Sequence, residues 1–220
     1  MSKILIFSDT HFSPKFHSGL YEKLAGLIGQ ADEVIINGDF WEGYFYSFDQ
    51  FVNSPWKKLF PLLKEKKTIY LPGNHDPLSE LDTRTSLFSS KVQKEYEFRS
   101  GNTVFVCTHG DQYIESPGKK SILIRSPFWS SLLYAVYYSG MWLFRDRFWE
   151  IYRFENRRLQ KIQKQKYQGK VLVTGHTHLM DNQENYVNLG LMTFGFFQYT
   201  WIENGRVQQN ADRYDTSFFV

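Results

Sequence analysis

Five short apolar runs in this sequence each end in a turn that carries an acid, a histidine or an asparagine. The runs span residues 4–7, 33–36, 68–71, 104–108 and 170–174. Short runs without polar alternation are typical of strands buried on both faces, as in a sheet covered by helices. Side chains at strand ends are held by a rigid sheet, so these turns are the candidate positions for a functional site.

The remaining pattern predicts a layered α/β fold with a mixed sheet. Apolar positions recur at helical spacing over residues 20–29, and a further helix is expected to begin at Pro55. Residues 92–98 are predicted to form one strand. The stretch 186–207 is predicted to form strands with a turn at Asn204-Gly205. Helices and strands that alternate early, followed by hairpin strands, favour this architecture.

The five turns together contain a set of seven potential metal ligands. In chain order these are Asp9, His11, Asp39, Asn74, His109, His176 and His178. Any one of these motifs alone is more often a helix cap or a turn. However, five of the six histidines lie in the motifs and only His17 lies elsewhere. Seven ligands are too many for one tetrahedral ion and suit two ions that share a bridging carboxylate.

The ligand types favour two divalent ions of hard or borderline character. Carboxylates, imidazoles and an amide carbonyl suit manganese, with iron, zinc or cobalt as alternatives. The only cysteine, Cys107, is not needed for this site and excludes an intramolecular disulfide. The first apolar run is too short for a signal peptide. A cytoplasmic protein is therefore expected.

The motifs resemble those of the calcineurin-like metallophosphoesterase superfamily in type and order. They are Asp9-Thr-His11, Gly38-Asp39, Gly73-Asn74-His75-Asp76, His109-Gly110 and Gly175-His176-Thr177-His178. The resemblance implies a sandwich of two mixed β-sheets flanked by helices, with the metals at one rim. It covers most of a single domain, 1–220, in which residues 112–170 form an inserted helical lid.

The resemblance also implies a role for each position. Asp9, His11 and His178 would hold the first ion, Asp39 would bridge, and Asn74, His109 and His176 would hold the second. His75 would protonate the leaving oxygen and Asp76 would orient His75. The chemistry is consistent, because water bridging two divalent ions ionises near neutral pH and an imidazole exchanges protons there. Hydrolysis of a phosphoester or pyrophosphate bond is the expected reaction.

The insertion differs from the rest of the chain in charge and in aromatic content. Residues 112–170 hold 12 Lys/Arg and 4 Asp/Glu, which leaves 14 and 19 for the remainder. Residues 126–144 carry no charge over 19 positions. A membrane span is excluded there, because it would separate His109 from His176, which belong to one site. Two helices are expected instead, the second with Ile151 and Leu159 facing inward and a basic outer face.

Two interpretations of the insertion remain open at this point. Its aromatic residues could simply pack the insertion onto the core. Alternatively, the insertion could accept an acyl chain and rest on an anionic membrane, with Trp129, Trp142 and Trp149 on an exposed rim. Arg125, Arg153 and Arg157 are the candidate substrate-binding residues.

In the second interpretation, the insertion resembles the lid of UDP-2,3-diacylglucosamine hydrolases. The motifs Gly38-Asp39-Phe40-Trp41-Glu42 and His109-Gly110-Asp111 also resemble that branch, although those enzymes commonly carry arginine where this chain has His75. The expected substrate is a phosphorylated small molecule or a lipid-linked nucleotide, with peripheral contact at the inner face of the membrane. One alternative is a nuclease or nucleotide phosphodiesterase whose basic helix contacts nucleic acid. Another is a non-catalytic scaffold.

Overall fold

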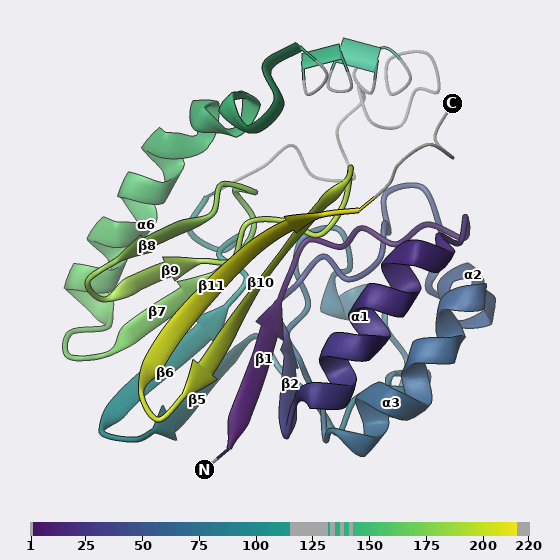
Figure 1. Cartoon of the computed structure of the whole chain (residues 1–220), viewed down its shortest axis with the longest axis horizontal. Helices are drawn as coiled ribbons and strands as arrows, with labels where there is room; N and C mark the ends of the chain where they lie inside the picture. Colours follow the sequence, from purple (N-terminus) through teal and green to yellow (C-terminus); the bar gives the residue numbers. More distant parts are fainter. Residues whose placement is uncertain (1, 115–131, 133–134, 137–138, 141–142, 215–220) are drawn as a thin grey trace.

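Two mixed β-sheets pack face to face, with helices on their outer faces (Figure 1). The computed structural model describes residues 2–114, 132, 135–136, 139–140 and 143–214. One sheet has the strand order β11-β10-β1-β2-β3-β4, and the other has the order β5-β6-β7-β9-β8. Each contains parallel and antiparallel pairs. The predicted sandwich of two mixed sheets flanked by helices is confirmed.

The first sheet is built around two central strands that are buried on both faces. Its strands are β1 (Lys3–Phe7), β2 (Glu33–Ile36), β3 (Ile69–Tyr70), β4 (Lys91–Val92), β10 (Phe196–Glu203) and β11 (Arg206–Arg213). In β1, Leu5 and Phe7 pack in the core beneath the helices, while Ile4 and Ile6 pack between the two sheets. Successive side chains of a strand point to opposite faces, so a strand between two apolar layers needs a continuous apolar run.

The helices over the first sheet are α1 (Ser18–Gln30), α2 (Phe48–Asn53) and α3 (Phe60–Glu65). Leu20, Leu24 and Ile28 form the buried stripe of α1, as their spacing predicts. Pro55 does begin a helix, but its first turn is the 3-10 helix η1 (Pro55–Leu59), which leads into α3. Two further 3-10 turns, η2 (Leu78–Glu80) and η3 (Thr83–Leu87), precede β4.

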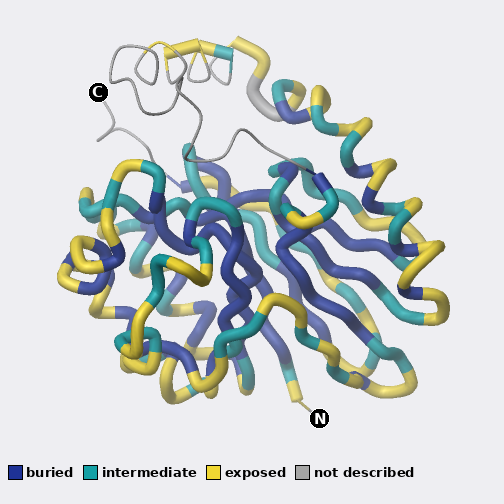
Figure 2. The backbone as a smooth tube through the Cα atoms, turned by 180° about the vertical axis from the view of Figure 1, so that it is seen from behind, coloured by how far each residue is buried: buried dark blue, intermediate teal, exposed yellow. Residues whose placement is uncertain are grey.

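The second sheet is covered on its outer face by one long helix. Its strands are β5 (Glu95–Ser100), β6 (Thr103–Thr108), β7 (Val171–Thr174), β8 (Asp181–Gln183) and β9 (Tyr186–Asn188). The 3-10 helix η4 (Arg145–Tyr152) leads into α6 (Arg153–Lys166), whose Leu159 packs on Val106 and Leu172. Figure 2 shows buried residues along the strands and exposed residues along the outer side of this helix.

One predicted strand is wrong and one predicted turn is confirmed. The run 92–98 is two strands, because β4 pairs with β3 in the first sheet and β5 pairs with β6 in the second. Residues 93–94 carry the chain from one sheet to the other. The β10–β11 hairpin turns at Asn204-Gly205, both with positive φ (50° and 77°). Such φ values match the twist of a two-residue hairpin.

Residues 143–166, within the predicted insertion 112–170, are helical but pack differently from the prediction. Trp149 is only 2% exposed, so it is not part of an exposed rim, and Ile151 is 64% exposed rather than inward. Trp129, Trp142 and Arg125 lie outside the described residues, as does most of 126–144. Every helix in the described ranges is too short or too polar to span a bilayer.

Candidate metal centre

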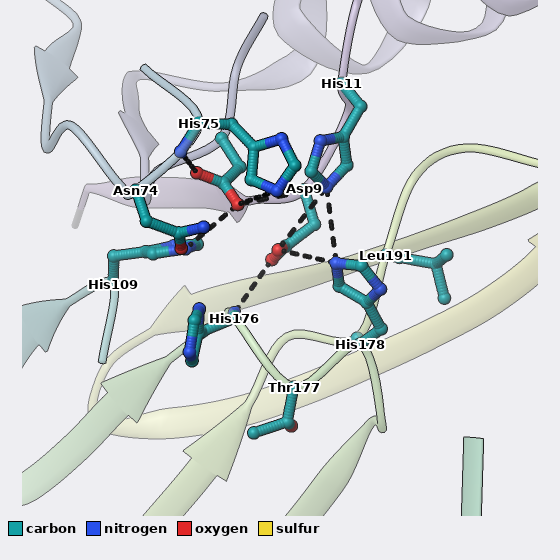
Figure 3. Close-up of polar contacts among 12 residues, drawn as sticks. Asp9, His11, Asn74, His75, His109, His176, Thr177, His178 and Leu191 are labelled. Carbon is teal, nitrogen blue, oxygen red and sulfur yellow. Dashed lines mark hydrogen bonds and ion pairs between the residues drawn. The ribbon is translucent and has the colours of Figure 1, made fainter. Parts of the chain in front are cut away.

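Loops that follow strands of both sheets meet at one rim of the sandwich (Figure 3). Backbone hydrogen bonds join them in pairs. The amide of Asp9 donates to Gly38 O (3.0 Å), and the amide of Gly175 donates to His109 O (3.0 Å). The amide of His176 donates to a carboxylate oxygen of Asp9 (3.2 Å), which links the two sheets. The carboxyl ends of parallel strands thus carry the candidate ligands, as is usual for sites in α/β sheets.

The candidate ligands form three overlapping groups whose ligand atoms lie within 4.8 Å of one another. The groups are Asp9 with His11 and His178, His11 with Asp39 and His75, and Asp39 with His109 and His176. The first group contains the three residues expected to hold the first ion, and the third contains Asp39 with two of the three residues expected at the second ion. Asp39 lies between them, with its Oδ2 atom 3.2 Å from His109 Nε2 and 3.9 Å from His11 Nε2.

Backbone strain is concentrated in these loops. Eight residues other than glycine have positive φ in the described ranges, and five of them are candidate ligands. They are Asp9 (53°), His11 (45°), Asp39 (51°), His176 (69°) and His178 (60°). Such backbone conformations are unfavourable for residues with a Cβ and persist only where the surrounding structure enforces them. The tight left-handed turns bring side chains two residues apart toward one small volume.

Two motif glycines are required because the loops approach the cluster so closely. A Cβ at Gly73 would lie 2.3 Å from Asp39 Oδ1 and 2.6 Å from His109 Cδ2. A Cβ at Gly175 would lie 2.4 Å from Asp9 Oδ2. Any larger residue would therefore displace a candidate ligand.

Hydrogen bonds to backbone carbonyls orient the histidines that follow the second sheet. His109 Nδ1 donates to Asn37 O (2.9 Å), which leaves Nε2 facing Asp39. His176 Nε2 donates to Ile114 O (3.1 Å), which leaves Nδ1 available to bind a metal ion. Such outer hydrogen bonds fix the tautomer and the ring direction of metal-binding histidines.

Glu42, and not Asp76, lies against the ring of His75. Its Oε1 atom lies 2.7 Å from His75 Nδ1, and its Oε2 atom lies 3.2 Å from His11 Nδ1. Asp76 instead accepts hydrogen bonds from three backbone amides and from the hydroxyl of Tyr70. The expectation that Asp76 orients His75 is therefore corrected. Glu42 was missed although it follows Asp39 by only three residues.

The acids and histidines of the cluster shift one another's ionisation. Burial opposes charge on Asp39, but the nearby histidines outweigh it and hold the pKa of this carboxyl well below its usual range. Burial likewise opposes charge on His11, but Glu42 and the aspartates raise its pKa to about 9. The pKa of Glu42 falls to about 2 because His75 and His11 outweigh its burial. Burial, together with His109, lowers the pKa of His176 to about 4.

The oxygen and nitrogen atoms that face the centre of the cluster are suitable ligands for divalent metal ions. In the described part of the chain, Asn74 Oδ1 is buried without a hydrogen-bond partner, while Asp9 Oδ1 and His109 Nε2 contact only other members of the cluster, His178 and Asp39, at 3.2 Å. Buried polar atoms are rarely left unsatisfied, and each is a ligand type suited to such ions. Asn74 Nδ2 donates to the hydroxyl of Tyr44 (2.9 Å), which directs its carbonyl oxygen inward.

Two of the three candidate substrate-binding arginines are described, and both lie at the surface. Arg153 is exposed and pairs with Glu150, while Arg157 is exposed on the outer side of α6. Arg125 lies outside the described residues. Among the hydrogen bonds and ion pairs of the described residues, none joins Arg153 or Arg157 to the candidate ligands.

Solved structures with a similar fold are known. The chain is similar to YfcE, a phosphoesterase from E. coli, with 16% identity and a TM-score of 0.50 over 96% of this chain and 100% of that one. It also aligns with vacuolar protein sorting 29 from Cryptosporidium parvum, with 14% identity and a TM-score of 0.49 over 98% of both chains.

No curated protein matches the sequence. The sequence profile described as calcineurin-like phosphoesterase matches residues 2–180, which is most of the chain. The protein therefore belongs to the calcineurin-like phosphoesterase family.

Proposed function

We propose that this protein hydrolyses a phosphoester or pyrophosphate bond with two divalent metal ions, of which manganese is the first candidate. Asp9, His11 and His178 would hold one ion, and Asn74, His109 and His176 the other, with Asp39 shared. When bound, the ions would neutralise charge on the phosphoryl group and activate the attacking water. The observation that supports the proposal is the convergence of six of these seven side chains in close groups, beside the buried Asn74 oxygen that lacks a hydrogen-bond partner.

The protein's own residues supply the proton for the leaving group. Glu42 holds His75 Nδ1 at 2.7 Å, so His75 Nε2 is the atom directed toward Asp39, 4.0 Å away. The ring of Tyr44 stacks on that of His75 at a centroid distance of 3.8 Å. An imidazole fixed on both sides can donate a proton from Nε2 to a leaving oxygen.

For the substrate, we propose a UDP-linked acylated sugar cleaved at its pyrophosphate. Besides the motif resemblance, the exposed apolar residues near the start of α6 support this choice, since Phe144, Ile151 and Phe154 are 60–76% exposed. Exposed arginines, including Arg153 and Arg157, lie beside them. Apolar and cationic surface in one place suits an acyl chain and an anionic headgroup or membrane. We propose 112–170 as the insertion within the 1–220 domain that provides this surface.

Hydrolysis by metal-stripped protein resupplied with Mn²⁺ tests both parts of the proposal. UDP-2,3-diacylglucosamine and bis-p-nitrophenyl phosphate are compared, with chelator and the Asp39→Ala variant as controls. Preference for the lipid supports the whole proposal. Cleavage of the generic diester alone supports the metal centre and rejects the substrate. No cleavage of either would reject catalysis and favour a scaffold.

A further inference from the structure

The loop that carries His176 and His178 is held by residues from the 112–170 insertion on three sides. The carbonyl of Ile114 accepts a hydrogen bond from His176 Nε2 (3.1 Å). The ring of Trp149 meets that of His178 edge-on, with centroids 4.9 Å apart and planes at 75°. On the third side, Asn156 of α6 contacts Thr177, which lies between the two histidines.

The contact with Asn156 is a buried polar network rather than a surface hydrogen bond. Thr177 Oγ1 donates to Asn156 Oδ1 (2.6 Å), and Asn156 Nδ2 donates to Leu179 O (3.0 Å). Asn188 Nδ2 donates to Gly175 O (2.8 Å) and reaches Thr177 Oγ1 (3.0 Å). Asn156, Thr177 and Asn188 are at most 1% exposed. In such surroundings each lost partner leaves a buried polar atom unsatisfied, so the network has one strongly preferred arrangement.

The backbone of this loop needs such support. His176 and His178 both adopt positive φ, at 69° and 60°, which an isolated segment would avoid. Thr177 is fully enclosed between them. Among the hydrogen bonds of the described residues, the bond from the Thr177 hydroxyl is the one that joins a side chain of this loop to a helix.

We propose that Asn156 is a positioning residue for the metal centre: it fixes the Gly175–His178 turn so that both histidines face the ions. This inference rests on the proposed function, because it takes His176 and His178 as ligands. It assigns α6, a helix on the outer face of the second sheet, a direct influence on metal affinity. Outer-shell residues of this kind typically change metal affinity about 10–100-fold when replaced.

Calorimetric titration of the metal-stripped protein with Mn²⁺ measures this influence directly. Asn156→Leu removes the bonds to Thr177 and Leu179 together with those that Asn156 Oδ1 accepts from Tyr186 and Asn188. We expect Mn²⁺ affinity to fall about 10-fold or more. Thr177→Val should weaken binding to a similar extent, whereas Thr177→Ser keeps the hydroxyl and should bind like the wild type. The double variant Asn156→Leu/Thr177→Val should bind Mn²⁺ no more weakly than the single variant with the lower affinity. Both substitutions remove the same hydrogen bond, so their effects should not add.

Gln163→Leu is the matched control for general destabilisation. Gln163 is a buried amide on the same face of α6, but it donates to Tyr167 O and Lys170 O at the far end of the helix. We expect this variant to lower thermal stability in chelator while leaving Mn²⁺ affinity unchanged. Wild-type affinity in Asn156→Leu, or an equal loss in Gln163→Leu, would overturn the positioning role alone. Absence of Mn²⁺ binding by the wild type would overturn the proposed function with it.

Discussion

The two sheets contribute to the metal centre through loops that are ordered in different ways. In the loops of the first sheet, buried carboxylates do the ordering: Asp76 accepts hydrogen bonds from the amides of Asp39, Phe40 and Gly73. In the loops of the second sheet, the neutral side-chain amides of Asn156 and Asn188 act beside the Asp9 carboxylate, which accepts a hydrogen bond from the amide of His176.

The two sides also differ in the ionisation of their side chains before any metal ion binds. Asp9, Asp39 and Glu42 all come from the first-sheet side, and they raise the pKa of His11 to about 9 against the effect of burial. His176, on the other side, has a pKa lowered to about 4 by burial and by its neighbour His109. The first-sheet side therefore carries the carboxylates. On the other side burial lowers the pKa of His176, whereas Asp39 and Asp9 raise the pKa of His109 well above its usual range in spite of its burial.

The largest effect is expected for Asp39→Ala, which removes the carboxylate that both sides approach. Metal-dependent turnover should fall to background, a loss at least as large as the roughly 10²–10³-fold seen when one electrostatic transition-state contact is removed. Steady-state hydrolysis of bis-p-nitrophenyl phosphate with Mn²⁺ measures it. Full turnover in this variant would remove the shared-ligand assignment.

His75→Ala tests a residue of the first-sheet side that is expected to act on the leaving group. Turnover should slow by about 10²–10⁴-fold while Mn²⁺ binding stays intact, because general acids typically contribute that much. The slowing should be largest for poor leaving groups, measured over a series of aryl phosphodiesters. Equal slowing across the series would argue against proton donation.

Glu42→Gln and Asp76→Asn separate orientation of His75 from ordering of the loops. Asp76→Asn places an amide among four donors, and the unsatisfied groups should lower the free energy of unfolding by about 1–3 kcal/mol. Glu42→Gln should affect turnover more than stability, since Glu42 contacts the rings of His75 and His11. Urea denaturation in chelator and turnover with Mn²⁺ give the two readouts. The reverse pattern would restore Asp76 as the partner of His75.

A pair of glycine substitutions contrasts a position beside the cluster with one far from it, and the smallest effect of all is expected at the second, Gly26. At Gly73 a methyl group would meet Asp39 and His109, so Gly73→Ala should weaken Mn²⁺ binding. Gly26 lies in α1 with nothing within 4 Å of a Cβ, so Gly26→Ala should leave binding unchanged and stabilise the fold by about 0.4–1 kcal/mol. Thermal unfolding and calorimetry check both. Unchanged Mn²⁺ binding in Gly73→Ala would show that the loops can shift to accommodate a methyl group without displacing Asp39 or His109.

The sequence by itself determined the strands and the positions of the candidate ligands. Buried strands need short apolar runs, and the turn that follows each run must lie at the end of its strand, at the rim of the sheet. Apolar spacing likewise placed α1, and Asn204-Gly205 marked the final hairpin. These are local signals, carried by residues a few positions apart, so they can be recognised without knowledge of the fold.

Only the tertiary structure decided which side chains meet across the chain. Glu42 reaches His75 over 33 positions, and Asn156 reaches Thr177 over 21, and no periodicity encodes either contact. The same holds for the run 92–98, which is divided because its two halves find partners in different sheets. Trp149, expected on an exposed rim, is buried against His178. Burial and pairing depend on what the rest of the chain packs nearby, and a local pattern does not contain that information.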